Sequence, residues 1–198
     1  HLLLEKEGGR LDRPALIVLP TSLIFNWKRE AARFAPDLAV LSLHGPERKR
    51  RFAEIPGNDV ILTTYPLLWR DAAELMRYSY HLLILDEAQT VKNAQSRGAE
   101  AVRRIDTRHR LCLTGTPLEN HLGELWSQFD FLLPGFLGGG RQFARHWRTP
   151  IEKLNDSRRR DLLARRIRPF ILRRKKEDVA QELPAKTIIV RTVELEGG

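Results

Sequence analysis

The stretch LLILDEAQ, residues 82–89, joins four consecutive apolar residues to two adjacent carboxylates. An apolar run of this length without polar alternation is typical of a strand that is buried on both faces, as in parallel sheets. In such sheets the ligand sites lie beyond the carboxyl ends of the strands. Asp86 and Glu87 stand at that place, so the stretch predicts both a layered architecture and a candidate site.

The segments on either side alternate between strand and helix patterns. Apolar segments predict further strands at residues 14–19, 38–43, 60–62 and 111–113. Helical patterns separate them at residues 23–34, 48–51, 66–77, 97–105 and 122–133. We expect Thr21 or Ser22 to cap the first of these helices and Pro36 to end it. The expected fold class is therefore α/β, a mostly parallel sheet covered by helices on both faces.

The pattern changes after residue 133, where glycine and proline signals are followed by basic segments. Arginine and lysine cluster at residues 158–160, 165–166 and 173–176, and Pro169 and Pro184 are expected to break these helices. Residues 187–195 alternate and are rich in β-branched side chains, which predicts a strand. We therefore expect three parts: a main lobe over 1–133, a basic helical protrusion over 134–186, and a closing strand of the lobe over 187–198.

Composition limits the function classes. The 198 residues carry 34 Lys and Arg against 25 Asp and Glu, a formal charge of +9, which favours an anionic partner such as nucleic acid. A basic but inert surface is the alternative. No run approaches the roughly 18 apolar residues of a membrane span, and the N-terminus does not resemble a signal peptide. We expect no membrane partner and no secretion.

Cysteine and histidine usage indicates neither a disulfide nor a structural metal site. Cys112 is the single cysteine and lies in an apolar segment, so we interpret it as a core residue in a reducing compartment. The six histidines show no metal-ligand spacing. The expected location is the cytoplasm or nucleoid if the source is bacterial, and the nucleus if it is eukaryotic.

The carboxylate pair has the chemistry that nucleotide hydrolysis requires. One carboxylate can hold the magnesium that bridges the β- and γ-phosphates of ATP, and the other can orient the attacking water. We assign Asp86 to Mg²⁺ and Glu87 to the water. An Asp-Glu cap of the following helix is the structural alternative.

Hydroxyl side chains follow three other predicted strands. Thr114, Gly115 and Thr116 come after the fifth strand, where they can relay the phosphate state to the carboxylates, although an ordinary turn is the alternative. Hydroxyls at the ends of two further strands suit nucleic-acid phosphates, although each is also a common helix cap; they are Thr21, Ser22, Thr63 and Thr64.

Together and in this order, these segments resemble the first lobe of a superfamily II helicase, and most closely the Swi/Snf branch. Residues 86–89 are similar to the second motif of that branch, in which His or Gln fills the position of Gln89. Residues 113–120, with Leu125 and Trp126, are similar to the third motif. Residues 26–36 match the helix after motif Ia, and residues 172–186 resemble the stretch that closes the lobe.

The resemblance implies a RecA-like lobe of a P-loop NTPase that pairs with a second RecA-like lobe of the same protein. ATP and Mg²⁺ would bind between the lobes, with Gln89 joining Asp86 and Glu87 at the nucleotide. Double-stranded DNA would lie across both lobes. In this family, hydrolysis drives translocation along DNA and remodels complexes with DNA-bound proteins, as in chromatin remodelling, usually without separating the strands.

The chain departs from the family pattern in one respect. It contains no Gly-x-x-x-x-Gly-Lys-Ser/Thr, the phosphate-binding Walker A loop, which in the family lies just before the helix that residues 1–7 resemble. We therefore expect the isolated chain, which also lacks the second lobe and its arginine finger, not to hydrolyse ATP. A non-catalytic nucleic-acid-binding module that kept the fold remains an alternative, and the pairing of Asp86 with Glu87 favours the enzyme. A strand-separating helicase is a third interpretation, and residues 172–174 and the extra basic helices argue against it.

Overall fold

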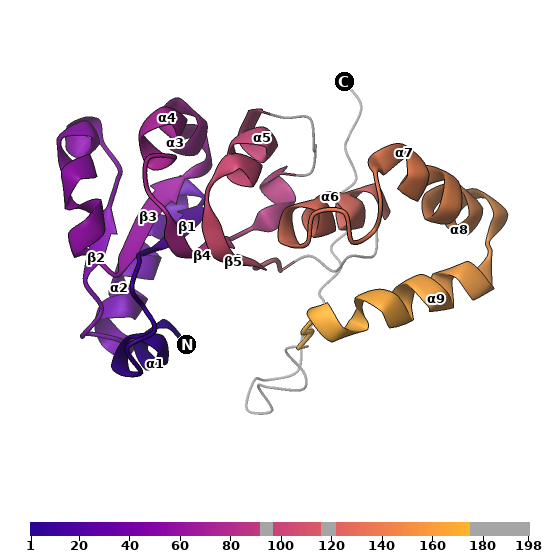
Figure 1. Cartoon of the computed structure of the whole chain (residues 1–198), viewed down its shortest axis with the longest axis horizontal. Coiled ribbons are helices and arrows are strands. Elements are labelled where there is room, and N and C mark those ends of the chain that lie inside the picture. The colour runs from indigo at the N-terminus through magenta and orange to yellow at the C-terminus, as the bar shows by residue number, and fades with distance from the viewer. Residues whose placement is uncertain (92–96, 116–121, 175–198) are drawn as a thin grey trace, which may run out of the picture. The chain divides into compact units, whose positions relative to one another are not determined.

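A five-stranded parallel sheet forms the centre of the computed structural model, which describes residues 1–91, 97–115 and 122–174. The strands are β1 (Ala15–Leu19), β2 (Val40–Ser42), β3 (Val60–Thr64), β4 (Tyr80–Leu85) and β5 (Thr107–Cys112). Their order in the sheet is β2-β3-β1-β4-β5, and every neighbouring pair is parallel (Figure 1). The predicted α/β class and parallel sheet are confirmed.

The register of the sheet brings the ends of three strands to one edge. β1 lies in the middle, with Leu19 opposite Thr64 of β3 and Val18 opposite Leu85 of β4. Every residue of β1, β3 and β4 is buried, as their continuous apolar character predicts. The segments that follow these strands therefore start next to one another, and this edge carries the candidate site.

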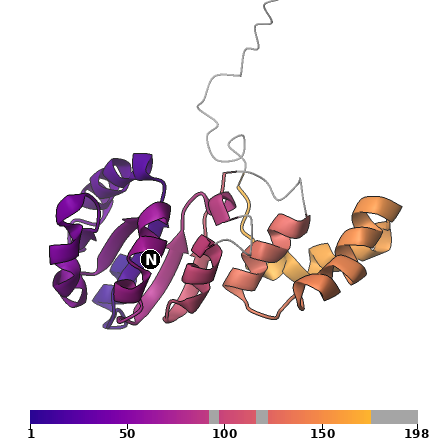
Figure 2. The same ribbon diagram turned by 90° about the horizontal axis from the view of Figure 1, so that it is seen from above.

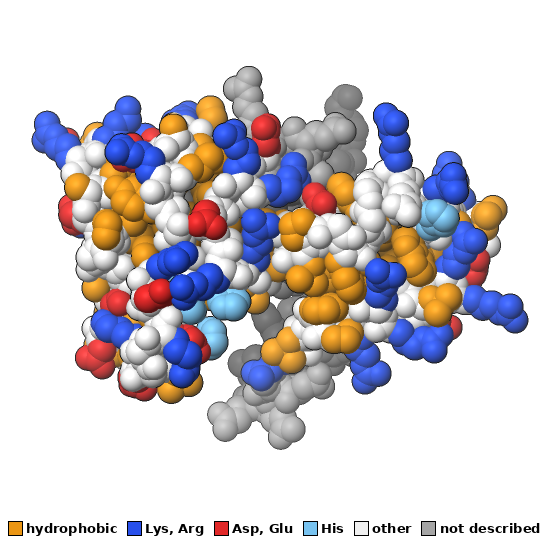
Figure 3. Space-filling model, in the orientation of Figure 1, with side chains coloured by type: hydrophobic (Ala, Val, Ile, Leu, Met, Phe, Trp, Pro, Cys, Tyr) orange, Lys and Arg blue, Asp and Glu red, His pale blue; other side chains and the backbone are white. Residues whose placement is uncertain are grey.

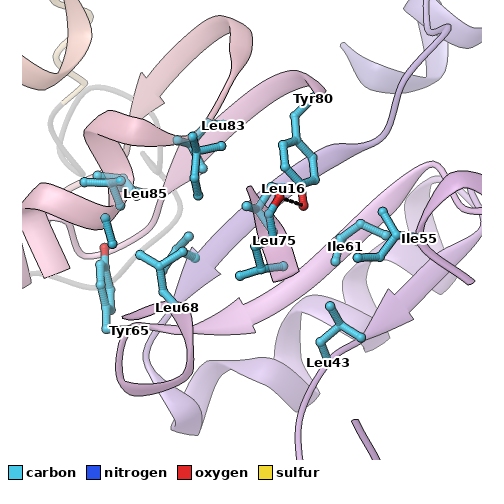
Figure 4. Close-up of a cluster of buried hydrophobic side chains, with 14 of the residues drawn as sticks. Leu16, Leu43, Ile55, Ile61, Tyr65, Leu68, Leu75, Tyr80, Leu83 and Leu85 are labelled. Carbon is cyan, nitrogen blue, oxygen red and sulfur yellow. Dashed lines mark hydrogen bonds between the residues drawn. The ribbon is translucent and has the colours of Figure 1, made fainter. Parts of the chain in front are cut away.

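Alternate residues of the strands supply two separate hydrophobic clusters, one on each face. The first cluster includes Leu16, Ile61 and Leu83 and is covered by the 3₁₀ helix η2 (Pro46–Gly57), α3 (Tyr65–Arg70), α4 (Ala72–Leu75) and α5 (Arg97–Arg104). Figure 4 shows Leu16 beside Leu75 of α4 and Ile61 beside Ile55 of η2.

The second cluster, on the opposite face, includes Ile17, Leu62 and Ile84. It is covered by α1 (Leu2–Glu7) and α2 (Ile24–Phe34), so the strands lie between two layers of helices (Figure 1 and Figure 2). Burial of both faces, which the apolar strand pattern predicted, is confirmed.

Two helix expectations were wrong. The single helix predicted for residues 66–77 is broken at Asp71, which separates α3 from α4 and whose carboxylate binds the Arg48 guanidinium. The predicted cap at Thr21 or Ser22 is absent: a short 3₁₀ turn (Thr21–Leu23) precedes α2, and no side-chain cap bond is present within this described segment. The chain enters α2 through a turn, so those two hydroxyls stay exposed.

Beyond β5, the chain continues in helices. α6 (Leu122–Leu132), α7 (Gly140–Phe143), a π-helical turn (Ala144–Arg148) and α8 (Thr149–Leu154) belong with the sheet to one compact unit, His1–Asp156. Trp126 connects α6 to the loop that contains Gly138 and Gly139, because its indole N–H donates a hydrogen bond to the Gly138 carbonyl at 2.9 Å.

A second unit begins at Ser157 with α9 (Ser157–Ile167) and a 3₁₀ turn (Arg168–Phe170). The helix ends before Pro169, as predicted, and its arginines are exposed. The predicted break at Pro184 and the predicted strand at 187–195 lie outside the described residues, and the boundary expected at residue 133 stays a prediction.

No helix within the described ranges is both long and apolar enough to cross a membrane. Lys and Arg are spread over the face shown in Figure 3, with acidic side chains between them.

Candidate functional site

Asp86 is held from several sides at the end of β4. Its backbone N–H donates to the Val18 carbonyl at 2.9 Å, which continues the pairing with β1. Its carboxylate accepts two hydrogen bonds, from the backbone N–H of Glu87 to Oδ1 at 2.9 Å and from the indole N–H of Trp27 to Oδ2 at 2.7 Å. The Tyr65 hydroxyl donates to its carbonyl oxygen at 2.7 Å. These contacts fix both the backbone and the side chain of Asp86.

Glu87 has a left-handed backbone with φ of 51°. Among the described non-glycine residues, only Asn155 shares a positive φ, and there an asparagine ends α8 in the usual way. For glutamate this conformation costs about 1–2 kcal/mol. Such strain occurs where the surrounding structure requires a particular side-chain direction, and here it falls on one member of the carboxylate pair.

A short hydrogen-bonded chain links the carboxylate pair to the end of β5. The Gln89 side-chain amide donates to the Glu87 carboxylate, and the Thr114 hydroxyl donates to the Gln89 Oε1 atom at 2.9 Å. The structure therefore brings together Asp86, Glu87, Gln89 and Thr114.

The other predicted site residues are placed differently. Gly115 follows Thr114 on the exposed surface, and Thr116 lies outside the described residues. Thr21 and Ser22 are exposed in the turn after β1. Thr63 and Thr64 are each 1% exposed, so in this structure their side chains face the interior rather than a nucleic acid.

Two residues at the site were missed from the sequence, which placed Trp27 on an apolar helix face and in the stretch that matches the helix after motif Ia, but gave it no role at the carboxylates. Trp27 and Tyr65 are packed in opposite hydrophobic clusters, yet each has a polar atom that reaches Asp86. Burial raises the pKa of Tyr65 above its usual range, so its hydroxyl stays a donor. A buried indole N–H or phenol O–H normally has an acceptor, which is a usable sequence signal, but it does not name the acceptor.

The carboxylate oxygens of Asp86 and Glu87 are of the kind that suits a magnesium ion bound together with a nucleotide. Carboxylate oxygens are the ligands that Mg²⁺ prefers, and the ion usually takes one or two of them together with phosphate and water. Within the described ranges, no group of three or more His, Cys, Asp or Glu side chains could hold a metal unaided. The assignment of Asp86 as such a ligand stays a prediction.

Cys112, at the end of β5, has no catalytic environment. It packs against the first hydrophobic cluster, and burial raises its pKa to about 12. The thiol is therefore uncharged at neutral pH, in agreement with its interpretation as a core residue.

Comparison with known proteins identifies the lobe. A family model described as the SNF2-related domain matches residues 1–198. The chain belongs to the SNF2-related family. It is similar to the SWI2/SNF2 ATPase core of Sulfolobus solfataricus solved in complex with double-stranded DNA, with a TM-score of 0.82 and 37% identity over 90% of the chain. The predicted Swi/Snf resemblance and RecA-like lobe are confirmed.

Curated relatives of this SNF2-related chain include a protein described as a helicase/translocase and others described as TATA-binding protein-associated factors. It is 45% identical over 91% of its length to a Bacillus subtilis protein described as an ATP-dependent helicase/translocase, YwqA. It is 39% identical over 88% of its length to the TATA-binding protein-associated factor MOT1 of Saccharomyces cerevisiae. The chain spans 20% and 10% of these two proteins and 37% of the Sulfolobus core.

Proposed function

We propose that this SNF2-related lobe belongs to an ATP-driven motor that moves along double-stranded DNA and remodels complexes of DNA with bound proteins. The observation that carries the proposal is the hydrogen-bonded group at the ends of β4 and β5, in which Thr114 and Gln89 lead to the carboxylate pair. Such a group would connect the carboxylates that act on the ATP phosphates to the end of β5, which could move with the state of the nucleotide.

The two carboxylates have different roles in this proposal. Bound Mg²⁺ would supply charge neutralisation across the β- and γ-phosphates of ATP. Asp86, whose orientation is fixed by two donors, would offer the ion a ligand. Glu87, turned by its left-handed backbone, would accept a hydrogen bond from the attacking water and orient it. Gln89 would report the state of Glu87 to Thr114.

Contact with DNA is assigned to the exposed turn after β1. Thr21 and Ser22 present hydroxyls and backbone groups there, and the +9 charge of the chain favours the phosphate backbone. Because Thr63 and Thr64 are buried, we assign them to holding the end of β3. A second RecA-like lobe of the same protein would complete the nucleotide site and the DNA track.

A non-catalytic nucleic-acid-binding module is the alternative from another class. Such a module would not need both carboxylates. It would also not need a strained glutamate that connects the carboxylate pair to Gln89 and Thr114. The retention of this geometry at Glu87 favours the enzyme.

Phosphate release by the complete protein tests the proposal. We expect ATP hydrolysis that requires Mg²⁺ and rises on addition of duplex DNA, and release of a third strand from a DNA triplex without separation of the duplex. The 198-residue chain alone is the matched control, for which we expect no turnover because its sequence has no phosphate-binding loop. DNA binding by the complete protein without phosphate release would instead support the non-catalytic module.

A further inference from the structure

Asp86 receives one side-chain donor from each face of the sheet. Trp27 packs with the cluster on the α2 face, and its indole N–H reaches the Asp86 carboxylate 59 residues away in sequence. Tyr65 packs with the cluster on the α3 face, and its hydroxyl reaches the Asp86 carbonyl. Figure 4 shows the Tyr65 hydroxyl turned towards the end of β4 at Leu85. The two donors therefore restrain Asp86 from opposite sides.

Both donors lie close to segments that end at the proposed DNA-facing edge. Trp27 lies in the first turn of α2, four residues after Leu23, the last residue of the exposed turn Thr21–Leu23. Tyr65 is the first residue of α3, immediately after Thr64 of β3. Leu23 and Ile24 pack against the same cluster as Trp27, so a displacement of the turn is expected to move the indole with it.

We propose that Trp27 and Tyr65 are positioning residues that couple DNA contact to the metal-binding carboxylate Asp86, an inference that rests on the proposed DNA-dependent ATPase. DNA on the turn after β1 sets the position of α2, and Trp27 transmits it to the carboxylate. Tyr65 holds the backbone of Asp86 in place from the other face. A displacement of α2 by bound DNA thus shifts the Asp86 carboxylate that Trp27 holds.

A purely structural role would have different consequences. Indole N–H and phenol O–H groups are often hydrogen-bonded only because they are buried, in which case their removal lowers stability and affects activity with and without DNA alike. A coupling role predicts a selective loss of the DNA-stimulated rate. The two roles are separated by comparing turnover with and without DNA, together with the unfolding temperature.

The variants Trp27→Phe and Tyr65→Phe of the complete protein remove one donor each and keep the ring. Trp69→Phe is the matched control, because Trp69 lies on α3 with 41% of its surface exposed. We expect each test variant to lower the DNA-stimulated kcat about tenfold, the effect of losing a hydrogen bond to a fixed functional group. The DNA-free rate should fall much less than the DNA-stimulated rate, the Kd for DNA should change little, and Trp69→Phe should behave as the unchanged protein.

A second readout needs no nucleotide. With ¹⁵N-labelled tryptophan, the indole resonance that disappears in Trp27→Phe belongs to Trp27. We expect this resonance to move on addition of duplex DNA and also in Asp86→Asn, while the Trp69 resonance stays in place on both changes.

The outcomes separate this inference from the proposed function. Unchanged DNA stimulation in both variants, or an equal loss of DNA-free and DNA-stimulated rates, would overturn the coupling and leave the proposed ATPase intact. Absence of DNA-stimulated hydrolysis in the unchanged protein would overturn both. If Trp27→Phe fails to fold, Tyr65→Phe decides alone, since it removes a single oxygen atom.

Discussion

Asp86 and Glu87 are adjacent in the chain, but their carboxylates have different partners, so their replacement should have different effects. Glu87→Gln keeps the shape and the contact with Gln89 and removes the charge that orients water. We expect kcat of the complete protein to fall about a thousandfold, within the range of general-base effects, with the Kd for ATP almost unchanged. Phosphate release and fluorescent-nucleotide binding measure the two quantities.

Asp86→Asn provides the contrast at the neighbouring position. Loss of a charged magnesium ligand should weaken nucleotide binding in the presence of Mg²⁺ about tenfold or more, and change binding in EDTA much less. Near-normal turnover in Glu87→Gln, or equal nucleotide binding by both variants, would show that the two roles are wrongly assigned.

At the residue scale, the chemistry of the site could be predicted but its geometry could not. Two carboxylates after an apolar strand indicate where a metal and a water would be handled. The left-handed backbone of Glu87 depends on contacts made after folding, since Ala88 bonds to Leu113 across the strand ends. The bond from Trp27 to Asp86 likewise depends on how α2 packs on the sheet.

At the scale of elements, the break between α3 and α4 depends on a buried ion pair. The Arg48 guanidinium binds the Asp71 carboxylate with two hydrogen bonds of 2.7 and 3.1 Å, and the side chains are 15% and 5% exposed. Asp71→Ala would leave the Arg48 charge buried, which should lower the free energy of unfolding by about 3 kcal/mol. Urea unfolding followed by tryptophan fluorescence is the measurement.

The exposed ion pair of η2 supplies the control for that change. Glu47 is 66% exposed and binds Arg50, which is 84% exposed, so Glu47→Ala should cost less than about 0.5 kcal/mol. Equal effects of the two changes would contradict a stabilising role for the buried pair.

The buried pair of Arg48 and Asp71 also explains why the helix pattern over 66–77 was misleading. The apolar periodicity continues through Asp71, but the partner of Asp71 comes from a different helix.

A buried histidine at the start of β4 should make the same sheet sensitive to acid. His81 is 5% exposed, its Nδ1 atom has no hydrogen-bond partner among the described residues, and its ring meets His109 edge-on at 5.3 Å. Burial lowers the pKa of His81, with the nearby His109 acting in the same direction. The folded state therefore favours the neutral ring.

The sign of the pH effect follows from that lowered pKa. Below about pH 6.5 the unfolded chain binds a proton at His81 before the folded state does. The free energy of unfolding therefore decreases as the pH is lowered, until the pH reaches the pKa of His81 in the folded state. His81→Phe should reduce the loss of melting temperature between pH 7.5 and 5.5, and His44→Gln, at an exposed histidine, should not. An unchanged pH dependence in His81→Phe would exclude this contribution.

At the scale of the whole molecule, the layered architecture was predictable because three central strands are apolar throughout and therefore buried on both faces. The edges were less predictable. β5 begins at Thr107, four residues before the predicted segment, because an edge strand leaves residues such as Arg108 and His109 exposed and hides the apolar signal. The division of the chain at Ser157 likewise has no clear mark in the sequence.

Charge at the same scale predicts how the complete protein binds DNA. The chain carries +9, and the proposed contact turn offers hydroxyls and backbone groups rather than a base-reading element, so the phosphate backbone should dominate. If about six phosphates are neutralised, affinity for duplex DNA should fall roughly a thousandfold between 50 and 200 mM salt. Fluorescence anisotropy on two duplexes of unrelated sequence measures this, and both should give the same slope. A single lysine or arginine contact removed by mutation should reduce that slope by about one, equally on both duplexes. A flat salt response, or a strong preference for one duplex, would mean that the protein reads bases and that the turn after β1 is not its main contact.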